Sequence, residues 1–160
     1  FKVTPNGKFT TLVDFNKTNG SKPYGGLMQA KNGNFYGTTS EGGKFDLGTI
    51  FKVTPNGKFT TLVDFNNLNG ALPYARLIQS NKNGNFYGTT KEGGFANCGS
   101  IFKLTANGTL TTLVNFNRAN GAYPYAGLIQ ASDGSFYGTT REGGKYPQRG
   151  TVFKLTLPDS

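Results

Sequence analysis

The chain has 160 residues and a formal net charge of +9, from 17 lysines and arginines against eight aspartates and glutamates. It contains no histidine and one cysteine, which excludes a Ser-His-Asp triad, a histidine metal centre, an internal disulfide and a cysteine-cluster metal site. Glycine at 24 positions and 14 phenylalanines predict short strands, many turns and an aromatic core. We expect an all-β protein without a metal, a cofactor or a membrane span, and the scattered positive charge is interpreted as solubilising.

One unit is repeated three times along the chain. Residues 51–66 repeat residues 1–16 letter for letter, and Asn-Phe-Tyr-Gly-Thr-Thr at 34–39 returns at 85–90 and, with serine first, at 135–140. A unit of this length cannot bury its own apolar faces and packs against its neighbours. We therefore expect a single repeat domain over 1–160, with units at approximately 17–66, 67–117 and 118–160, the last completed by 1–16.

Six Asn-Gly or Asp-Gly pairs separate the apolar segments and predict β-hairpins with type I′ turns. Two hairpins per unit give four strands per unit. The expected strands are 26–30, 34–39, 49–54 and 58–65 in the first full unit, 76–80, 85–90, 100–105 and 109–116 in the second, and 127–131, 135–140 and 151–156 in the third.

The third unit stops before its fourth strand, and residues 8–15 carry the matching sequence. Apolar residues fall on both faces of the strands, as at Ile50 and Phe51, which is typical of a sheet packed between two others. We expect β-propeller blades, with the last blade closed by the N-terminal strand. A β-trefoil is the alternative, because it also uses three four-stranded repeats.

A closed propeller has about four to eight blades, so three blades are too few to close a ring. A homodimer or higher assembly, a longer chain or an open stack would each supply the rest. We expect the chain to pair with another copy of itself through unclosed blade edges, since an exposed strand edge is a template for pairing.

Residues 124–144 read Pro-Tyr-Ala-Gly-Leu-Ile-Gln-Ala-Ser-Asp-Gly-Ser-Phe-Tyr-Gly-Thr-Thr-Arg-Glu-Gly-Gly, and 150–156 continue as Gly-Thr-Val-Phe-Lys-Leu-Thr. This pattern resembles the GloVer (Gloeobacter/Verrucomicrobia) tandem repeat and is similar, more distantly, to the propeller blades of two-component regulator sensors. The resemblance implies a bacterial, exported, β-propeller-like protein located outside the cell or at its surface. It implies no catalytic residues.

Three sets of repeated residues are candidates for glycan binding on one face of the molecule. A tyrosine ring stacks on a sugar, an asparagine amide hydrogen-bonds its hydroxyls, and a glutamate binds hydroxyls or a cation. Each set also has a structural interpretation, because asparagine forms turns and glutamate accepts backbone N–H groups in a Gly-Gly turn. The candidates are Tyr24, Tyr74, Tyr125, Glu41, Glu92, Glu142, Asn19, Asn69 and Asn120.

Other repeated residues are interpreted as structural. Gln29, Gln79 and Gln130 lie on the first strands, nearest the ring axis, and are expected to hydrogen-bond a neighbouring blade. Cys98 occupies a variable loop, where the other units have Leu47 and Arg149, and is interpreted as incidental.

We expect a non-catalytic exported module with a structural or glycan-binding role. The alternative is a polysaccharide lyase or hydrolase acting on an acidic polysaccharide, with Arg76 or Arg118 neutralising the sugar carboxylate. Near-identical units speak against one asymmetric active site, and a repeated carboxylate pair is not kept, because Asn115 replaces Asp14 and Asp64. Nucleic acid is not an expected partner, since neither a basic helix nor an RNA-binding signature is present.

Overall fold

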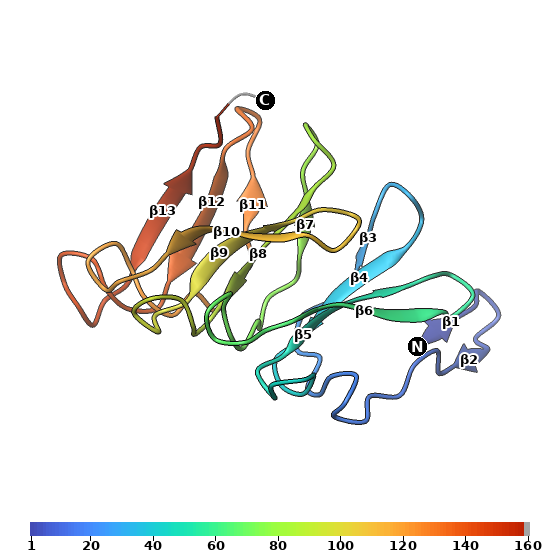
Figure 1. Ribbon diagram of the computed structural model, residues 1–160. Coiled ribbons are helices and arrows are strands. Elements are labelled where there is room, and N and C mark those ends of the chain that lie inside the picture. The colour runs from blue at the N-terminus through green and yellow to red at the C-terminus, as the bar shows by residue number, and fades with distance from the viewer. Residues whose placement is uncertain (159–160) are drawn as a thin grey trace.

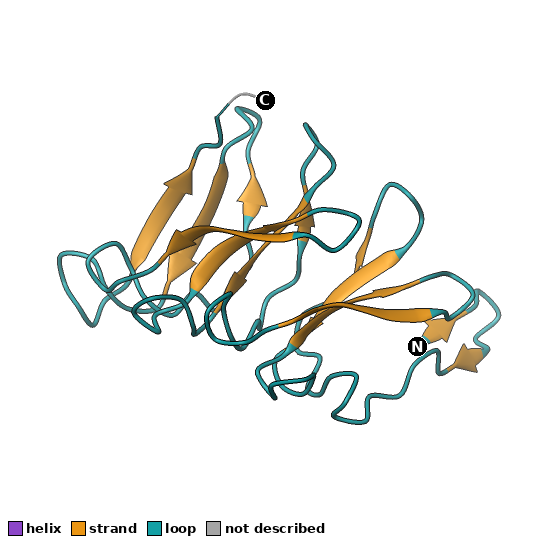
Figure 2. Ribbon diagram, in the orientation of Figure 1, coloured by secondary structure: helices purple, strands orange, loops and turns teal. Residues whose placement is uncertain are grey.

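The computed structural model describes residues 1–158, and this part of the chain contains strands and loops but no helix (Figures 1 and 2). Residues 159–160, the end of the third expected unit, lie outside it. An N-terminal hairpin is followed by two four-stranded meanders, blades 1 and 2, and a three-stranded one, blade 3. The hairpin comprises β1 (Lys2–Val3) and β2 (Phe9–Thr10), and blade 1 comprises β3 (Met28–Gln29), β4 (Phe35–Thr39), β5 (Thr49–Val53) and β6 (Phe59–Asp64). Blade 2 comprises β7 (Ile78–Gln79), β8 (Phe86–Thr90), β9 (Ser100–Leu104) and β10 (Leu110–Asn115). Blade 3 comprises β11 (Ile129–Gln130), β12 (Phe136–Thr140) and β13 (Thr151–Leu155).

The Asn-Gly and Asp-Gly pairs lie in hairpin turns, but the turn type differs from the expected one. Between β3 and β4, the Gly33 N–H donates to Ala30 O and the Ala30 N–H donates to Asn34 O, both at 2.9 Å. Gly33 has a φ of 80°, whereas Asn32 is not among the positive-φ residues. A type I′ turn requires positive φ at both central residues, so this is a type I turn followed by a left-handed glycine. The Asn32 side chain supports it by accepting the Asn34 N–H at 3.1 Å.

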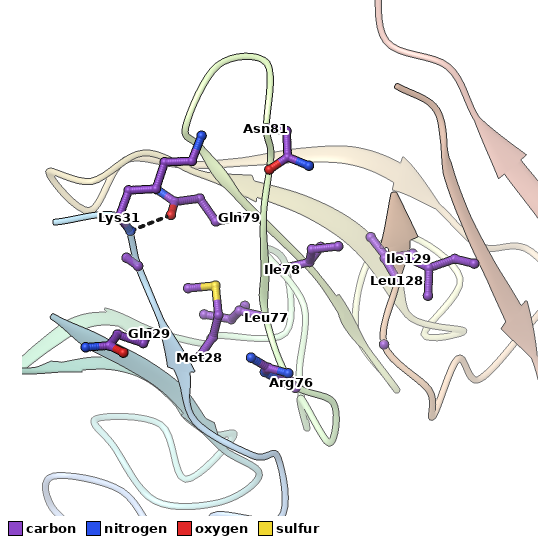
Figure 3. Close-up of a pocket in the computed structure, with 12 residues that line it drawn as sticks. Met28, Gln29, Lys31, Arg76, Leu77, Ile78, Gln79, Asn81, Leu128 and Ile129 are labelled. Atoms are coloured by element: carbon purple, nitrogen blue, oxygen red, sulfur yellow. Dashed lines mark hydrogen bonds between the residues drawn. The ribbon is translucent and has the colours of Figure 1, made fainter. Parts of the chain in front are cut away.

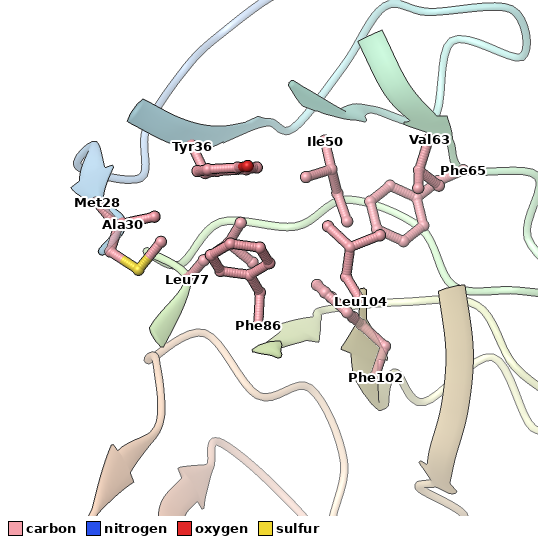
Figure 4. Close-up of a cluster of buried hydrophobic side chains, with 10 residues drawn as sticks. All are labelled: Met28, Ala30, Tyr36, Ile50, Val63, Phe65, Leu77, Phe86, Phe102 and Leu104. Atoms are coloured by element: carbon pink, nitrogen blue, oxygen red, sulfur yellow. The ribbon is translucent and has the colours of Figure 1, made fainter. Parts of the chain in front are cut away.

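The three blades lie side by side and bury their faces against one another (Figure 1). Between blades 1 and 2, the Tyr36 ring lies over the Phe86 ring with centroids 4.3 Å apart (Figure 4). Tyr87 and Phe136 repeat this contact between blades 2 and 3 at 4.4 Å. Propeller blades are therefore confirmed. The sheets form an open array, whereas the sheets of a β-trefoil would close on themselves within one chain.

A glycine in the second strand of each blade lets an aromatic ring lie flat against the backbone. A Cβ at Gly88 would lie 2.6 Å from Phe102 Cζ and 2.8 Å from Leu77 Cδ2. The same space is needed in blade 1, where a Cβ at Gly37 would lie 2.6 Å from Phe51 Cζ. The Phe-Tyr-Gly-Thr-Thr motif thus combines a core tyrosine with the glycine that makes room for the third-strand phenylalanine.

The expected closure of the last blade by the N-terminal strand is not formed within the chain. Strand β13 is the edge of its sheet, and β2 pairs with β1 instead, beside blade 1 (Figure 1). Phe15, which follows β2, packs on Phe51 at 5.2 Å and 62°, as Phe65 packs on Phe102 at 5.7 Å and 57°. Residues 1–16 have the sequence of a third and fourth strand, so they take the place of the outer half of a blade preceding blade 1.

A threonine near the end of the second strand links blade 1 to blade 2 and blade 2 to blade 3. The Thr38 hydroxyl of blade 1 donates to Ala75 O at 3.1 Å, and the Thr89 hydroxyl of blade 2 donates to Ala126 O at the same distance. These bonds hold the segment that enters the first strand of the next blade.

Cys98 is a packing residue. It is 2% exposed, belongs to the apolar cluster between blades 2 and 3, and its Sγ lies 3.2 Å from Ala96 O. The sequence indicates that Cys98 is incidental and not catalytic; the structure adds that its loop folds back onto the core.

Candidate functional site

Three tyrosines that precede the first strands of blades 1, 2 and 3 form a continuous stack, the tyrosine ladder. The rings of Tyr24 and Tyr74 have centroids 5.3 Å apart at 25°, and those of Tyr74 and Tyr125 are 5.5 Å apart at 40°. A residue with left-handed backbone precedes each Pro-Tyr pair and turns the chain toward the next blade. These residues are Lys22, Leu72 and Tyr123, with φ of 54°, 54° and 57°.

Two cations lie over the ladder. Lys91 Nζ is 5.8 Å from the Tyr74 centroid and 5.4 Å from the Tyr125 centroid, and Arg141 Cζ is 5.9 Å from the Tyr125 centroid. Such distances allow cation–π attraction. The hydrogen bond to Glu92 raises the pKa of Lys91 above its usual value, and Tyr125 adds to that rise. Lys91 therefore stays charged beside the rings.

The candidate glutamates lie next to the ladder loops, as expected from their positions in the unit. The backbone of Glu41 forms a β-bridge with Ser21, and the equivalent bridges recur in the other two units. The turn amide of Gly42 donates to Asp46 Oδ1 at 3.0 Å and not to the Glu41 carboxylate. Every candidate carboxylate instead has a basic partner. The ion pairs are Lys22–Glu41 at 2.7 Å, Lys91–Glu92 at 2.8 Å, Arg118–Glu142 at 3.6 Å and Arg141–Glu142 at 3.7 Å.

The candidate asparagines use their side-chain amides inside the loops. Asn69 Oδ1 accepts the Asn66 N–H at 2.9 Å, and Asn69 Nδ2 donates to Asp64 O at 3.4 Å. Asn19 and Asn120 make the corresponding bonds. These amides build the loops that carry the ladder, so the tyrosines, the glutamates and their cations form the accessible part of the predicted site.

Aromatic tips extend from the loops that follow each Glu-Gly-Gly segment. Phe45, Phe95 and Tyr146 are 48%, 97% and 63% exposed. Lys44 and Lys145 lie over the neighbouring Phe45 and Tyr146 rings, at 5.3 and 5.6 Å from the centroids. Exposed aromatic loops on a rigid scaffold are common in binding proteins.

A cleft of about 630 Å³ runs between the first strands of the three blades (Figure 3). Residues 28–31, 76–79 with Asn81, and 127–129 line it, and none of them is acidic. Figure 3 shows Arg76 and Lys31 at opposite ends of this inner cleft. Because Tyr74 precedes Arg76 by two residues, the Arg76 end adjoins the tyrosine ladder.

Sequence reasoning placed Gln29, Gln79 and Gln130 nearest the axis but did not find the lining of the inner cleft, because the lining depends on how three short strands lie side by side. One signal for it was present. Arg76 stands where the other units have Gly26 and Gly127, and so breaks the repeat at one end of the cleft.

In a comparison with family sequence models, the model of the Gloeobacter/Verrucomicrobia repeat matches residues 1–160. The chain belongs to the Gloeobacter/Verrucomicrobia repeat family. No curated protein matches it.

Two solved structures show the same arrangement of sheets as this Gloeobacter/Verrucomicrobia repeat protein. One is described as a streptogramin B lyase, with a TM-score of 0.50, 20% identity and coverage of 82% of this chain and 40% of that chain. The other is a putative gluconolactonase, with a TM-score of 0.55, 17% identity and coverage of 98% and 56%. At these identities the likeness shows a β-propeller-like fold alone, and the chain spans about half the length of these proteins or less.

Within residues 1–158 of the repeat protein, no helix has the length and apolar character needed to cross a membrane.

Proposed function

We propose that this chain is an exported, non-catalytic binding module that assembles with a second copy of itself through its open blade ends and presents the tyrosine ladder to a glycan. One observation supports the assembly above all others. The two ends of the blade array expose the two halves of an interface that occurs twice inside the chain.

The outer face of blade 3 is the first half of that interface. Ile50 and Ile101 are 0% and 1% exposed because the next blade covers them, whereas the equivalent Val152 is 79% exposed. Thr38 is likewise 1% exposed, while the equivalent Thr139 is exposed.

The opposite face of blade 1 is the second half. Leu77 and Leu128 are 2% and 6% exposed because the preceding blade covers them, whereas the equivalent Leu27 is 46% exposed. An apolar cavity of about 510 Å³ lies there, between Leu27, Phe51 and the N-terminal hairpin. Burial of such apolar surface drives association, at roughly 25 cal/mol per Å² removed from water.

Strand pairing would extend the same interface. Strands β5 and β9 pair with fourth strands in the registers Lys52↔Thr60 and Lys103↔Thr111, whereas β13 has no fourth strand. The same register places Lys154 opposite Thr10 of a second copy. In this assembly β2 would pair with β13 of the second copy and no longer with β1. Because β1 is only two residues long, little pairing is lost.

The ladder supports the glycan part of the proposal. Tyr24 and Tyr125 are 63% and 38% exposed in the single chain, so the ladder carries aromatic surface that a sugar ring can contact. The paired glutamates and lysines beside it offer acceptors and donors for hydroxyl groups. Equivalent positions on several blades raise avidity.

The enzyme alternative has less support. Each candidate glutamate is ion-paired, and Asp64, in a repeated acidic position, accepts the Lys44 N–H at 2.8 Å. The activities in the names of the two solved structures belong to those proteins, which share only the fold with this chain.

Native mass measured by light scattering over about a hundredfold range of protein concentration tests the assembly. We expect a two-chain particle that dissociates on dilution. In a Cys98→Ser background, Thr10→Cys with Lys154→Cys should give an inter-chain disulfide. Lys103→Cys with Thr111→Cys, which are already opposite each other, is the control for cross-linking at this register. A single-chain particle at all concentrations, without a disulfide between chains while the control pair forms one, would overturn the assembly.

Binding of neutral and acidic oligosaccharides, measured by calorimetry, tests the glycan part. Tyr24→Ala, Tyr74→Ala and Tyr125→Ala should each weaken binding. If no oligosaccharide binds, or if binding is unchanged in all three variants, the ladder is not the site.

A further inference from the structure

We propose that the inner cleft binds an acidic glycan, with the Arg76 guanidinium receiving a sugar carboxylate and Lys31 a second negative group further along the chain. This rests on the glycan-binding part of the proposed function and names the ligand class and a second subsite.

The polar side chains of the cleft are available to a ligand. Within residues 1–158, six of the 17 basic residues form ion pairs, and Arg76 and Lys31 are among those that do not, so neither is neutralised by a carboxylate. Gln79 Oε1 and Gln130 Oε1 accept backbone N–H groups of the preceding blade, but Gln29 Oε1 and the Asn81 side chain have no recorded hydrogen-bond partner in the described residues. The cleft therefore offers two cations, the Asn81 amide and the Gln29 Oε1 acceptor to a ligand, while Gln29 Nε2 donates to Gly33 O at 3.5 Å.

Charge and shape favour an elongated anion. The lining residues include two basic and no acidic side chains, so the local potential is positive. Arg76 and Lys31 lie at the two ends of the cleft (Figure 3), which requires negative groups that are spaced along the ligand. Apolar side chains also line the cleft, and Ile129, on its blade 3 side (Figure 3), is 66% exposed. An oligouronate combines spaced carboxylates, hydroxyls for the amides and apolar ring faces.

Arg76 is the cleft residue that the repeat does not explain. The other units have glycine at its position, and Gly26 leaves room for its side chain, since a Cβ there would meet only Arg76 Cδ, at 3.9 Å. An arginine presents a planar fork of N–H groups that matches a carboxylate in a bidentate way. We therefore expect arginine to be required, and not only a positive charge.

Calorimetric titration with tetragalacturonate tests the proposal, with its methyl ester as the neutral probe. We expect Arg76→Gln to weaken tetragalacturonate binding about tenfold or more, as for loss of a hydrogen-bonded charge. Arg76→Lys should restore part of the affinity. Arg149→Gln, the same change of charge in an exposed loop, should change the affinity less than about twofold, as is usual for a distant surface charge. NMR shifts of the Lys31 and Asn81 amides should place the ligand in the cleft.

The outcomes separate this proposal from the broader one. If tetragalacturonate and its methyl ester bind equally and Arg76→Gln has no effect while the ladder variants weaken binding, the ladder binds glycans and the acidic subsite is wrong. If neither probe binds, both are wrong. A stronger interaction with a single-stranded oligonucleotide than with tetragalacturonate would also overturn the acidic glycan as ligand.

Discussion

Gln79 and Lys31 join two neighbouring blades through one hydrogen bond, in which Gln79 Oε1 accepts the Lys31 backbone N–H at 2.9 Å. Gln130 and Asn81 repeat the bond at the next joint at 3.0 Å. The first-strand glutamines of blades 2 and 3 therefore each bind their blade to the one before it, as the sequence predicted.

Replacing this glutamine should destabilise the fold only where a preceding blade is present. We expect Gln79→Ala to lower the free energy of unfolding by about 1 kcal/mol, the usual value of one such bond. Gln29→Ala is the matched control, because Gln29 has the same place in blade 1 with no complete blade before it. Urea unfolding at dilutions where the chain is single measures both. Equal losses would contradict the assigned role of the bond.

Gly88→Ala should destabilise the chain by about 1–3 kcal/mol, the usual cost of forcing extra volume into a packed core. The new Cβ would lie 2.6 Å from Phe102 Cζ, so the ring or the strand must move. Gly26→Ala, with its nearest atom at 3.9 Å, should be neutral or slightly stabilising. Thermal unfolding followed by circular dichroism compares the two, and similar melting temperatures would show that the space beside Gly88 is not needed.

The pKa of Asp133 should lie below its usual value of 3.8, first because its carboxylate accepts the Ser135 N–H and second because of Lys154. A lowered pKa in the folded state gives stability that is present above the ordinary pKa and is lost as the pH falls through the folded pKa. NMR titration of the carboxyl group measures it. Lys154→Met should raise the pKa only part of the way, and a full return would mean that the Ser135 bond contributes nothing.

Tyr74→Leu should cost more stability than Tyr125→Leu. Tyr74 has ring neighbours on both sides and Tyr125 on one, and an aromatic pair is worth about 0.5–1.5 kcal/mol beyond its burial. The chain has no tryptophan, so its near-ultraviolet circular dichroism reports tyrosine and phenylalanine, and it should fall most in Tyr74→Leu. Equal effects of both replacements would mean that the rings do not act as a stack.

Much of the fold could be predicted from the repeat, because strand order and blade packing follow from a unit that must bury both faces. The turn type could not be predicted, because an Asn-Gly pair fits two kinds of hairpin turn and the pairing register of the two strands decides between them. Nor could the place of residues 1–16. Their sequence fits the free edge of β13 and the free face of blade 1 equally, and within this chain the Phe15–Phe51 contact holds them at blade 1.

The candidate site was predicted in part. The tyrosines, glutamates and asparagines are neighbours because they share one loop face, which their positions in the unit indicated. That the tyrosines stack on one another depends on the spacing of neighbouring blades, which no single unit contains. Arg76 was named from the sequence as a partner for a sugar carboxylate, but its place in a cleft was not, since its neighbours there come from three blades.

The repeated contact between neighbouring blades has a consequence for how such chains change in length. Each blade is joined to the next by the same phenylalanine contact, from Phe15–Phe51 to Phe116–Phe153. Insertion or loss of one whole repeat period, starting at any residue, keeps the order of strands along the chain. Both outer faces of the blade array also stay the same. Near-identical repeats are also the sequences in which such events are easiest, so members with different numbers of blades can arise in single steps without a new end having to evolve.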